Sequence, residues 1–254
     1  MEYQSNGPGS SATHGDMPTA YVTLILDETG SMQSCKGAAI AGVNEYLATL
    51  RRSPIPVQFT LTLFNSGKLE VRHRATPATD VSDLTEATYQ PADTTPLYDA
   101  IGRTLTEAGR DVRPDAKKLC VILTDGLENA SREYTRDGIV RMIKEWEGRG
   151  WTFVYLGADH DAWAAGGDLG IAGDNTVQFC RRETGRMFDR LGDATTSYLR
   201  EPNRQDTGFW KATSNDVSPD SAGMPEVTPG VPGIGDTALY RSIAPAPHTE
   251  GNQP

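Results

Sequence analysis

Apolar residues follow two alternating periods along the 254-residue chain. Short apolar runs rich in β-branched and aromatic residues predict strands at 21–26, 57–64, 119–123, 151–156 and, more weakly, 176–179. Between these runs, apolar residues recur every three or four positions, which is the period of a helix with one buried face. This second pattern predicts helices through 40–50, from 97 onward, at 134–148, after His160 and at 185–199.

The order of these elements predicts the fold class. Strands that alternate with helices form a mostly parallel sheet with helices on both faces. One exception is expected, because the turn signal Asn65-Ser66-Gly67 leads directly into the β-rich segment 68–72, as in an antiparallel hairpin. We therefore expect a three-layer, Rossmann-like α/β fold whose mostly parallel central sheet has one antiparallel edge strand.

Composition divides the chain into three parts. Residues 1–18 are polar and rich in Gly and Ser, which predicts a flexible N-terminal arm. The strands and helices lie in 19–200 and predict one folded domain. Half of the sixteen prolines fall in 201–254, among Gly, Ser and Thr, which predicts an extended C-terminal tail that is either disordered or ordered by a partner.

Charge and hydropathy exclude several classes of function. The net charge of -10 argues against nucleic-acid binding, which needs clustered Lys and Arg. No segment is apolar enough to span a membrane, and the N-terminal sequence lacks the pattern of a secretory signal. Three scattered cysteines do not form a disulfide framework. We expect a protein that is neither membrane-bound nor secreted by an N-terminal signal, and a cytoplasmic location.

Oxygen-bearing side chains gather where predicted strands end. Asp27, Thr29 and Ser31 follow the strand 21–26, Asp125 follows 119–123, and Thr95 precedes the helix that begins after Pro96. The carboxyl ends of parallel strands share one edge of a sheet, where α/β proteins bind their ligands. Carboxylate and hydroxyl oxygens suit hard cations such as Mg²⁺, Mn²⁺ or Ca²⁺. The pattern therefore predicts a divalent-cation site.

Three segments resemble the motifs of von Willebrand factor A domains and occur in the same order. They are Asp27-Glu28-Thr29-Gly30-Ser31-Met32, Thr94-Thr95-Pro96-Leu97-Tyr98-Asp99-Ala100-Ile101 and Leu123-Thr124-Asp125-Gly126-Leu127-Glu128-Asn129. In that family the motifs form a metal-ion-dependent adhesion site. The resemblance, which covers residues 18–200, implies that Ser31 and Thr29 bind Mg²⁺ directly, that Thr95 joins when a ligand is bound, and that Asp27 and Asp125 act through water.

Some neighbouring residues have two interpretations. Thr94 is adjacent to Thr95, and we choose Thr95 because it precedes Pro96 as in the family motif; its alternative role is to cap the helix. Glu28 either faces a partner or is a solvated loop carboxylate, and we favour the second. Asp99 is either an acceptor for a metal-bound water or an exposed helix residue.

The segment Asp159-His160-Asp161 follows the strand 151–156. A proton relay or a second metal site can be imagined there, but helix capping by the two aspartates is the simpler interpretation.

The resemblance implies a protein-binding module in which an acidic residue of a partner protein completes the metal shell. A second hypothesis is a structural component of a phage particle or other large complex, with neighbouring subunits bound by the 201–254 tail, since the compact form resembles bacterial and phage members. The virion would then be the location.

The third hypothesis is a phosphoryl-transfer enzyme with Asp27 as nucleophile, which is disfavoured because Thr29 stands where a second acidic residue is needed.

Overall fold

A six-stranded sheet forms the centre of the computed structural model, which describes residues 19–108, 112–201 and 208–210. The strands lie in the order β3-β2-β1-β4-β5-β6, and every neighbouring pair is parallel except β2 and β3. Their bounds are β1 Ala20–Asp27, β2 Val57–Asn65, β3 Lys68–Pro77, β4 Lys117–Thr124, β5 Trp151–Ala158 and β6 Thr176–Phe179. The predicted sheet and its antiparallel edge strand are confirmed.

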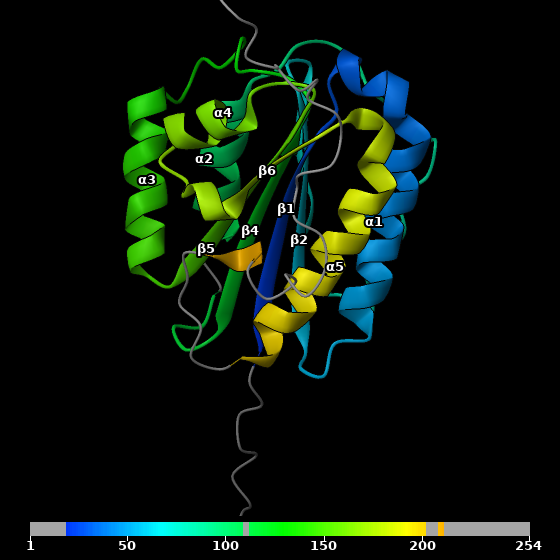
Figure 1. Cartoon of the computed structure of the whole chain (residues 1–254), viewed down its shortest axis with the longest axis vertical. Coiled ribbons are helices and arrows are strands. Elements are labelled where there is room, and N and C mark those ends of the chain that lie inside the picture. The colour runs from blue at the N-terminus through cyan, green and yellow to red at the C-terminus, as the bar shows by residue number, and fades with distance from the viewer. Residues whose placement is uncertain (1–18, 109–111, 202–207, 211–254) are drawn as a thin grey trace, which may run out of the picture. The chain divides into compact units, whose positions relative to one another are not determined.

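Helices cover both faces of the sheet, so the fold has three layers (Figure 1). One face carries α1 (Lys36–Arg51) and α5 (Thr184–Arg200), and the other carries α2 (Leu97–Ala108), α3 (Arg136–Gly148) and α4 (Ala162–Asp168). Short 3₁₀ helices occur at Gly30–Cys35 (η1), Gly173–Asn175 (η3) and Arg181–Glu183 (η4). All the helices predicted from the apolar period are present.

The central strands are apolar on both faces because each face has its own core. In β1, Leu24 and Leu26 pack into the core beneath α1 and α5, whereas Ile25 packs into the core beneath the other helices. In β4, Val121 and Ile122 divide in the same way. Successive side chains of a strand point to opposite faces, so a continuous apolar run is what a strand between two helical layers requires.

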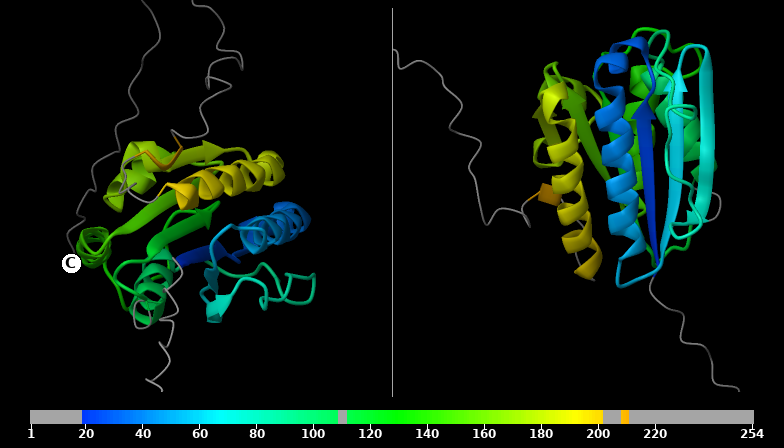
Figure 2. Two further views of the ribbon diagram at one scale, coloured as in Figure 1. Left: turned by 90° about the horizontal axis from the view of Figure 1, so that it is seen from below. Right: turned by 90° about the vertical axis from the view of Figure 1, so that its right-hand side faces the viewer.

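Helices α1 and α5 lie side by side on their face of the sheet (Figure 2). Gly42 of α1 permits this close approach, because a Cβ atom at that position would overlap the ring of Phe188 in α5. A Cβ atom placed on Gly37, about one and a half turns earlier in α1, would meet no other atom within 4 Å. The packing of α5 on α1 therefore leaves no room for a side chain at position 42.

The folded domain extends beyond residue 200, where the sequence placed its end. Phe209 is fully buried in the core of α1 and α5, with its ring centroid 5.9 Å from that of Tyr198. The backbone N–H groups of Gly208 and Phe209 both donate to Asn175 Oδ1. The predicted boundary is therefore too early. An isolated pair of aromatic residues, Phe209 and Trp210, gives no periodic signal, which explains the error.

The predicted N-terminal arm and almost all of the predicted C-terminal tail lie outside the described residues. Within residues 19–108, 112–201 and 208–210, no helix combines the length and the apolar character needed to cross a membrane.

Alanine substitutions at the two glycines of α1 test the packing of α1 on α5. We expect Gly42→Ala to lower the free energy of unfolding by about 1–3 kcal/mol, the usual cost of overpacking a core. Gly37→Ala should instead raise it by up to about 1 kcal/mol, since alanine favours the helix. Urea unfolding measures both, and equal changes in the two variants would contradict the close contact.

Candidate metal centre

The two aspartates of the predicted site meet where the strand order of the sheet reverses. From β1 the chain passes to β2 on one side and later to β4 on the other. Asp27 is the last residue of β1, and Asp125 directly follows β4. Ligands of open α/β sheets bind at such a reversal, beyond the carboxyl ends of the strands. The predicted convergence of these two residues at one edge is therefore what the topology produces.

Asp27 is fully buried and holds the start of the following loop. Its Oδ1 accepts from the backbone N–H of Thr29 at 2.7 Å, and its Oδ2 accepts from the hydroxyl of Thr124 at 2.5 Å. Burial raises the pKa of Asp27 from 3.8 to about 6, against the hydrogen bonds from Thr124 and Thr29, and the charge of Asp125 raises it slightly further. Burial therefore disfavours the ionised form of this carboxylate.

The hydroxyls of the β1 loop contact the second carboxylate. Ser31 Oγ donates to Asp125 Oδ1 at 2.6 Å, and Thr29 Oγ1 lies 3.1 Å from Ser31 Oγ. The two hydroxyls face the same way because η1 begins immediately after Thr29, whose carbonyl accepts from the N–H of Met32. Thr29, Ser31 and Asp125, three of the predicted ligands, are thus joined in one chain of hydrogen bonds.

Thr95, rather than Thr94, lies against the Asp125 loop. A Cβ atom placed on Gly126 would lie 3.0 Å from Thr95 Oγ1. The backbone N–H of Thr95 donates to Asn129 Oδ1, and its carbonyl accepts from the backbone N–H of Asn129. Thr94 is exposed, and its hydroxyl donates to Ser66 Oγ instead. Thr95 is therefore the threonine that lies beside the site, and its role as a ligand remains a prediction.

Glu28 is not a solvated loop carboxylate, and this interpretation was wrong. Its side chain is only 2% exposed, because the segment before Pro96 covers it. One oxygen accepts from the backbone N–H of Gln90, and the other lies 3.6 Å from Lys68 Nζ. Glu28 thus ties the β1 loop to the covering segment and does not face a partner.

Asp99 is also buried rather than exposed on its helix. Its two oxygens accept from the backbone N–H groups of Arg132, Glu133 and Tyr134, at 2.8 to 2.9 Å. Those three bonds hold the segment between Asp125 and α3. Asp99 therefore shapes a loop of the site, and a role for it as an acceptor of metal-bound water remains a prediction.

The two aspartates that flank His160 act differently from each other. Asp161 caps α4 as predicted, accepting from the N–H of Ala164 at 2.9 Å. Asp159 caps no helix, which corrects the prediction: its carboxylate accepts from Arg181 Nε at 2.5 Å and from the Arg181 backbone N–H at 3.2 Å. The ring of His160 hydrogen-bonds to Tyr155 Oη and the carbonyl of Ala158.

Three side chains of the site were not singled out by the sequence. Thr124 and Tyr89 both bind Asp27, Thr124 at the carboxylate and Tyr89 through its buried hydroxyl at the backbone carbonyl, 2.6 Å away. Arg181 Nη1 donates to Asp125 Oδ2 at 3.1 Å. Thr124 had a sequence signal, since it directly precedes Asp125, but Tyr89 and Arg181 lie too far away along the chain to be recognised.

The donors at this edge fit a hard divalent cation. In the described part of the chain, no group of three or more His, Cys, Asp or Glu side chains could hold a metal. The edge offers instead two carboxylates and at least two hydroxyls, which are the oxygen ligands that Mg²⁺ accepts together with water. Burial raises the pKa of Asp27 and so disfavours its ionised form.

Comparison with known proteins supports the fold. No protein-family model matches the sequence, and no curated protein sequence matches it. Proximal thread matrix protein 1 from the mussel byssus is 12% identical, with a TM-score of 0.55 over 71% of this chain and 47% of its own. The vWF domain of the type V pili tip protein Mfa5 from Porphyromonas gingivalis is 10% identical, with a TM-score of 0.55 over 73% of this chain and 97% of its own. The pilus adhesin SpaC from Lactobacillus rhamnosus GG is 15% identical, with a TM-score of 0.52 over 72% and 31%.

These similarities define the class of fold. This chain spans less than half of the mussel protein but nearly all of the Mfa5 domain. The chain therefore has the three-layer α/β fold of a von Willebrand factor A domain.

The raised pKa of Asp27 predicts a pH-dependent stability in the presence of a chelator. Its pKa is about 6 in the folded chain and 3.8 in the unfolded chain, so ionised Asp27 destabilises the fold above about pH 6 and protonation relieves this as the pH falls. We expect Asp27→Asn to be more stable than wild type at neutral pH by up to about 3 kcal/mol, because its amide oxygen can accept from the Thr29 N–H while its NH2 group donates to Thr124 Oγ1. The difference should shrink between pH 6.5 and pH 4.5.

Urea unfolding in EDTA across this pH range measures the difference between the two proteins. A difference that stays constant with pH would show that Asp27 is not the titrating group.

Proposed function

We propose that this chain is a protein-binding module in which a divalent cation at the β1–β4 edge is completed by an acidic residue of a partner protein. The observation that carries the proposal is the contact of the Ser31 hydroxyl with the Asp125 carboxylate, 2.6 Å apart and 94 positions apart in the chain. Thr29 extends this contact with a second hydroxyl. Such a cluster offers hard oxygen donors without enclosing the ion.

Each residue has a distinct part in this proposal. Ser31 and Thr29 would hold Mg²⁺, or Mn²⁺ or Ca²⁺, through their hydroxyls, and Thr95 would join when a partner binds. Asp27 and Asp125 would act through water, since Asp27 already accepts two hydrogen bonds from the protein. The bound ion would supply a Lewis acid that retains a position for the partner's carboxylate.

The charge of the chain gives a reason for a cation in this role. With a net charge of -10, the chain as a whole repels an acidic partner. A divalent cation at the contact point reverses the sign of the local field, so that a Glu or Asp of the partner is attracted there. Recognition would then depend on the ion rather than on a basic surface.

The rim of the same edge offers apolar contacts. Among the described residues, Leu127 and Trp163 are the large apolar side chains that are most exposed, at 59% and 58%. Leu127 lies two residues after Asp125, and Trp163 lies in the first turn of α4, which follows β5. Both therefore lie shortly after the carboxyl ends of their strands. Exposed apolar side chains around a polar anchor are common in protein interfaces.

Two proteins with this fold are a pilus tip protein and a pilus adhesin, which supports a role for this chain in protein assemblies. We extend the proposal to a multiprotein complex, in which the C-terminal tail would contact neighbouring subunits. A phage particle is one such setting. All of the tail except residues 201 and 208–210 lies outside the described structure.

The geometry gives little support to a phosphoryl-transfer enzyme. A nucleophilic Asp27 would need an accessible oxygen, but its side chain is buried and both oxygens accept hydrogen bonds from the following loop and β4. Binding therefore remains the better proposal.

Metal titration tests the proposed ligands. We expect one Mn²⁺ or Mg²⁺ to bind per chain, and Ser31→Ala to lose at least roughly 10-fold in affinity, as is typical when groups around a metal are removed. Thr94→Ala is the matched control, because it removes a hydroxyl that contacts Ser66 on the same edge. Calorimetry measures both affinities. Equal binding by the two variants would exclude Ser31 as a ligand.

Partner capture tests the metal bridge. Immobilised wild-type protein should retain a partner in Mg²⁺ and release it on chelation, because the partner's carboxylate loses the ion that it binds. Ser31→Ala should retain much less of the same partner, and Leu127→Ser should weaken capture without changing metal affinity. Mass spectrometry identifies the captured protein, and retention in EDTA would show that recognition does not require metal.

A further inference from the structure

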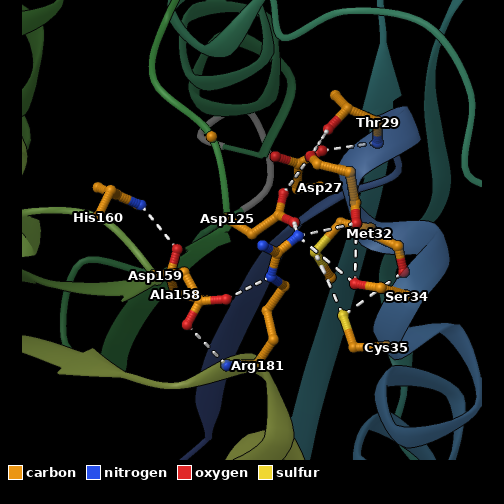
Figure 3. Close-up of polar contacts among 12 residues, drawn as sticks. Asp27, Thr29, Met32, Ser34, Cys35, Asp125, Ala158, Asp159, His160 and Arg181 are labelled. Carbon is orange, nitrogen blue, oxygen red and sulfur yellow. Dashed lines mark hydrogen bonds and ion pairs between the residues drawn. The ribbon is translucent and has the colours of Figure 1, made fainter.

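Arg181, which follows the edge strand β6, contacts the candidate metal centre. Arg181 begins η4, directly after β6 and Cys180. Its Nη1 lies 3.1 Å from Asp125 Oδ2, 3.2 Å from the carbonyl oxygen of Ser31 and 3.4 Å from Ser34 Oγ. Figure 3 shows the guanidinium between the Asp125 and Asp159 carboxylates. Arg181 thus contacts both elements that supply the proposed ligands.

Asp125 depends on this contact for its charge balance. Its side chain is fully buried, whereas that of Arg181 is 34% exposed. One carboxylate oxygen accepts from Ser31 and the other accepts from Arg181. A buried carboxylate without a cationic partner is strongly unfavourable, so the guanidinium supplies the positive charge that Asp125 needs when no metal is bound.

Asp159 fixes Arg181 in this position. It accepts from both the backbone N–H and the Nε of Arg181, while its own backbone N–H donates to the carbonyl of Phe179. Asp159 also has a φ of +57°, a left-handed conformation that is rare for a residue with a side chain. Strained residues of this kind persist where the surrounding structure holds them, commonly at functional sites. Asp159 therefore fixes both the backbone and the side chain of Arg181.

We propose that Arg181 is an internal counter-cation that competes with the divalent cation for Asp125. In the metal-free protein Arg181 neutralises Asp125 and stabilises the fold. A cation held by Ser31 and Thr29 next to Asp125 is repelled by the neighbouring guanidinium, so Arg181 weakens metal binding and allows it only when the ion concentration is high enough. This inference rests on the proposed metal site and adds a residue that sets its affinity.

Metal titration of two arginine variants tests the competition. Arg181→Gln should bind Mn²⁺ roughly 10-fold more tightly than wild type, within the range of coupling found between interacting sites. Arg182→Gln is the matched control, because it removes the same charge from the next, exposed residue, and it should leave the affinity nearly unchanged. Weaker or unchanged binding by Arg181→Gln would overturn the proposal, since a residue that only positions Asp125 would lower affinity when removed.

A measurement without metal separates this inference from the proposed function. In EDTA, Arg181→Gln should lower the Tm by roughly 5 °C, Arg182→Gln should not, and saturating Mn²⁺ should restore much of the loss. In the Asp125→Asn background, Arg181→Gln should have little further effect, because the charge that it balances is gone. Additive losses would overturn the counter-cation role.

The two measurements together distinguish the possible failures. If no variant binds metal, the proposed function and the competition both fail, while the EDTA comparison still shows whether Arg181 balances Asp125. If Arg181→Gln binds metal and wild type does not, the competition is supported in its strongest form.

Discussion

Two carboxylates held close together at the end of a parallel strand pair are the constraint on which the rest of this edge depends. Strands β1 and β4 are neighbours in register, so Asp27 and Asp125 emerge beside each other, and both are buried. Burial raises the pKa of Asp27, to which the adjacent charge of Asp125 adds. Negative charge concentrated in this way must be met by hydrogen-bond donors, by a cation or by protons.

The surrounding loops are arranged to supply those donors. The β1 loop turns its N–H and hydroxyl groups towards the two aspartates. The loop after Asp125 is in turn held by α2: Asp99 binds three of its N–H groups, and Glu128 accepts from the N–H of Tyr98 at the start of the helix. Loops fixed to one another in this way can present a site with little rearrangement, which reduces the entropic cost of binding a partner.

Positive charge can reach the site from inside or from outside the chain. Arg181 supplies it from η4, which follows the edge strand β6, and an ion would supply it from solvent. Under the proposed function, a site neutralised in both ways would remain folded without metal and would still gain stability from binding it. The ion pair with Arg181 gives the fully buried Asp125 side chain a cationic partner within the chain.

The order of strands and helices, the antiparallel edge and the convergence of Asp27 and Asp125 were predictable from sequence, because apolar period and parallel topology determine them locally. The burial of Glu28 and Asp99, the placement of Thr95 beside Gly126 and the insertion of Phe209 into the core were not. Arg181 illustrates the reason. It lies 56 positions from Asp125, and nothing in its local sequence distinguishes it from Arg182. Only tertiary structure decides which of two identical side chains meets a buried carboxylate, because that contact depends on the packing of β6 against β5 and on the conformation of Asp159.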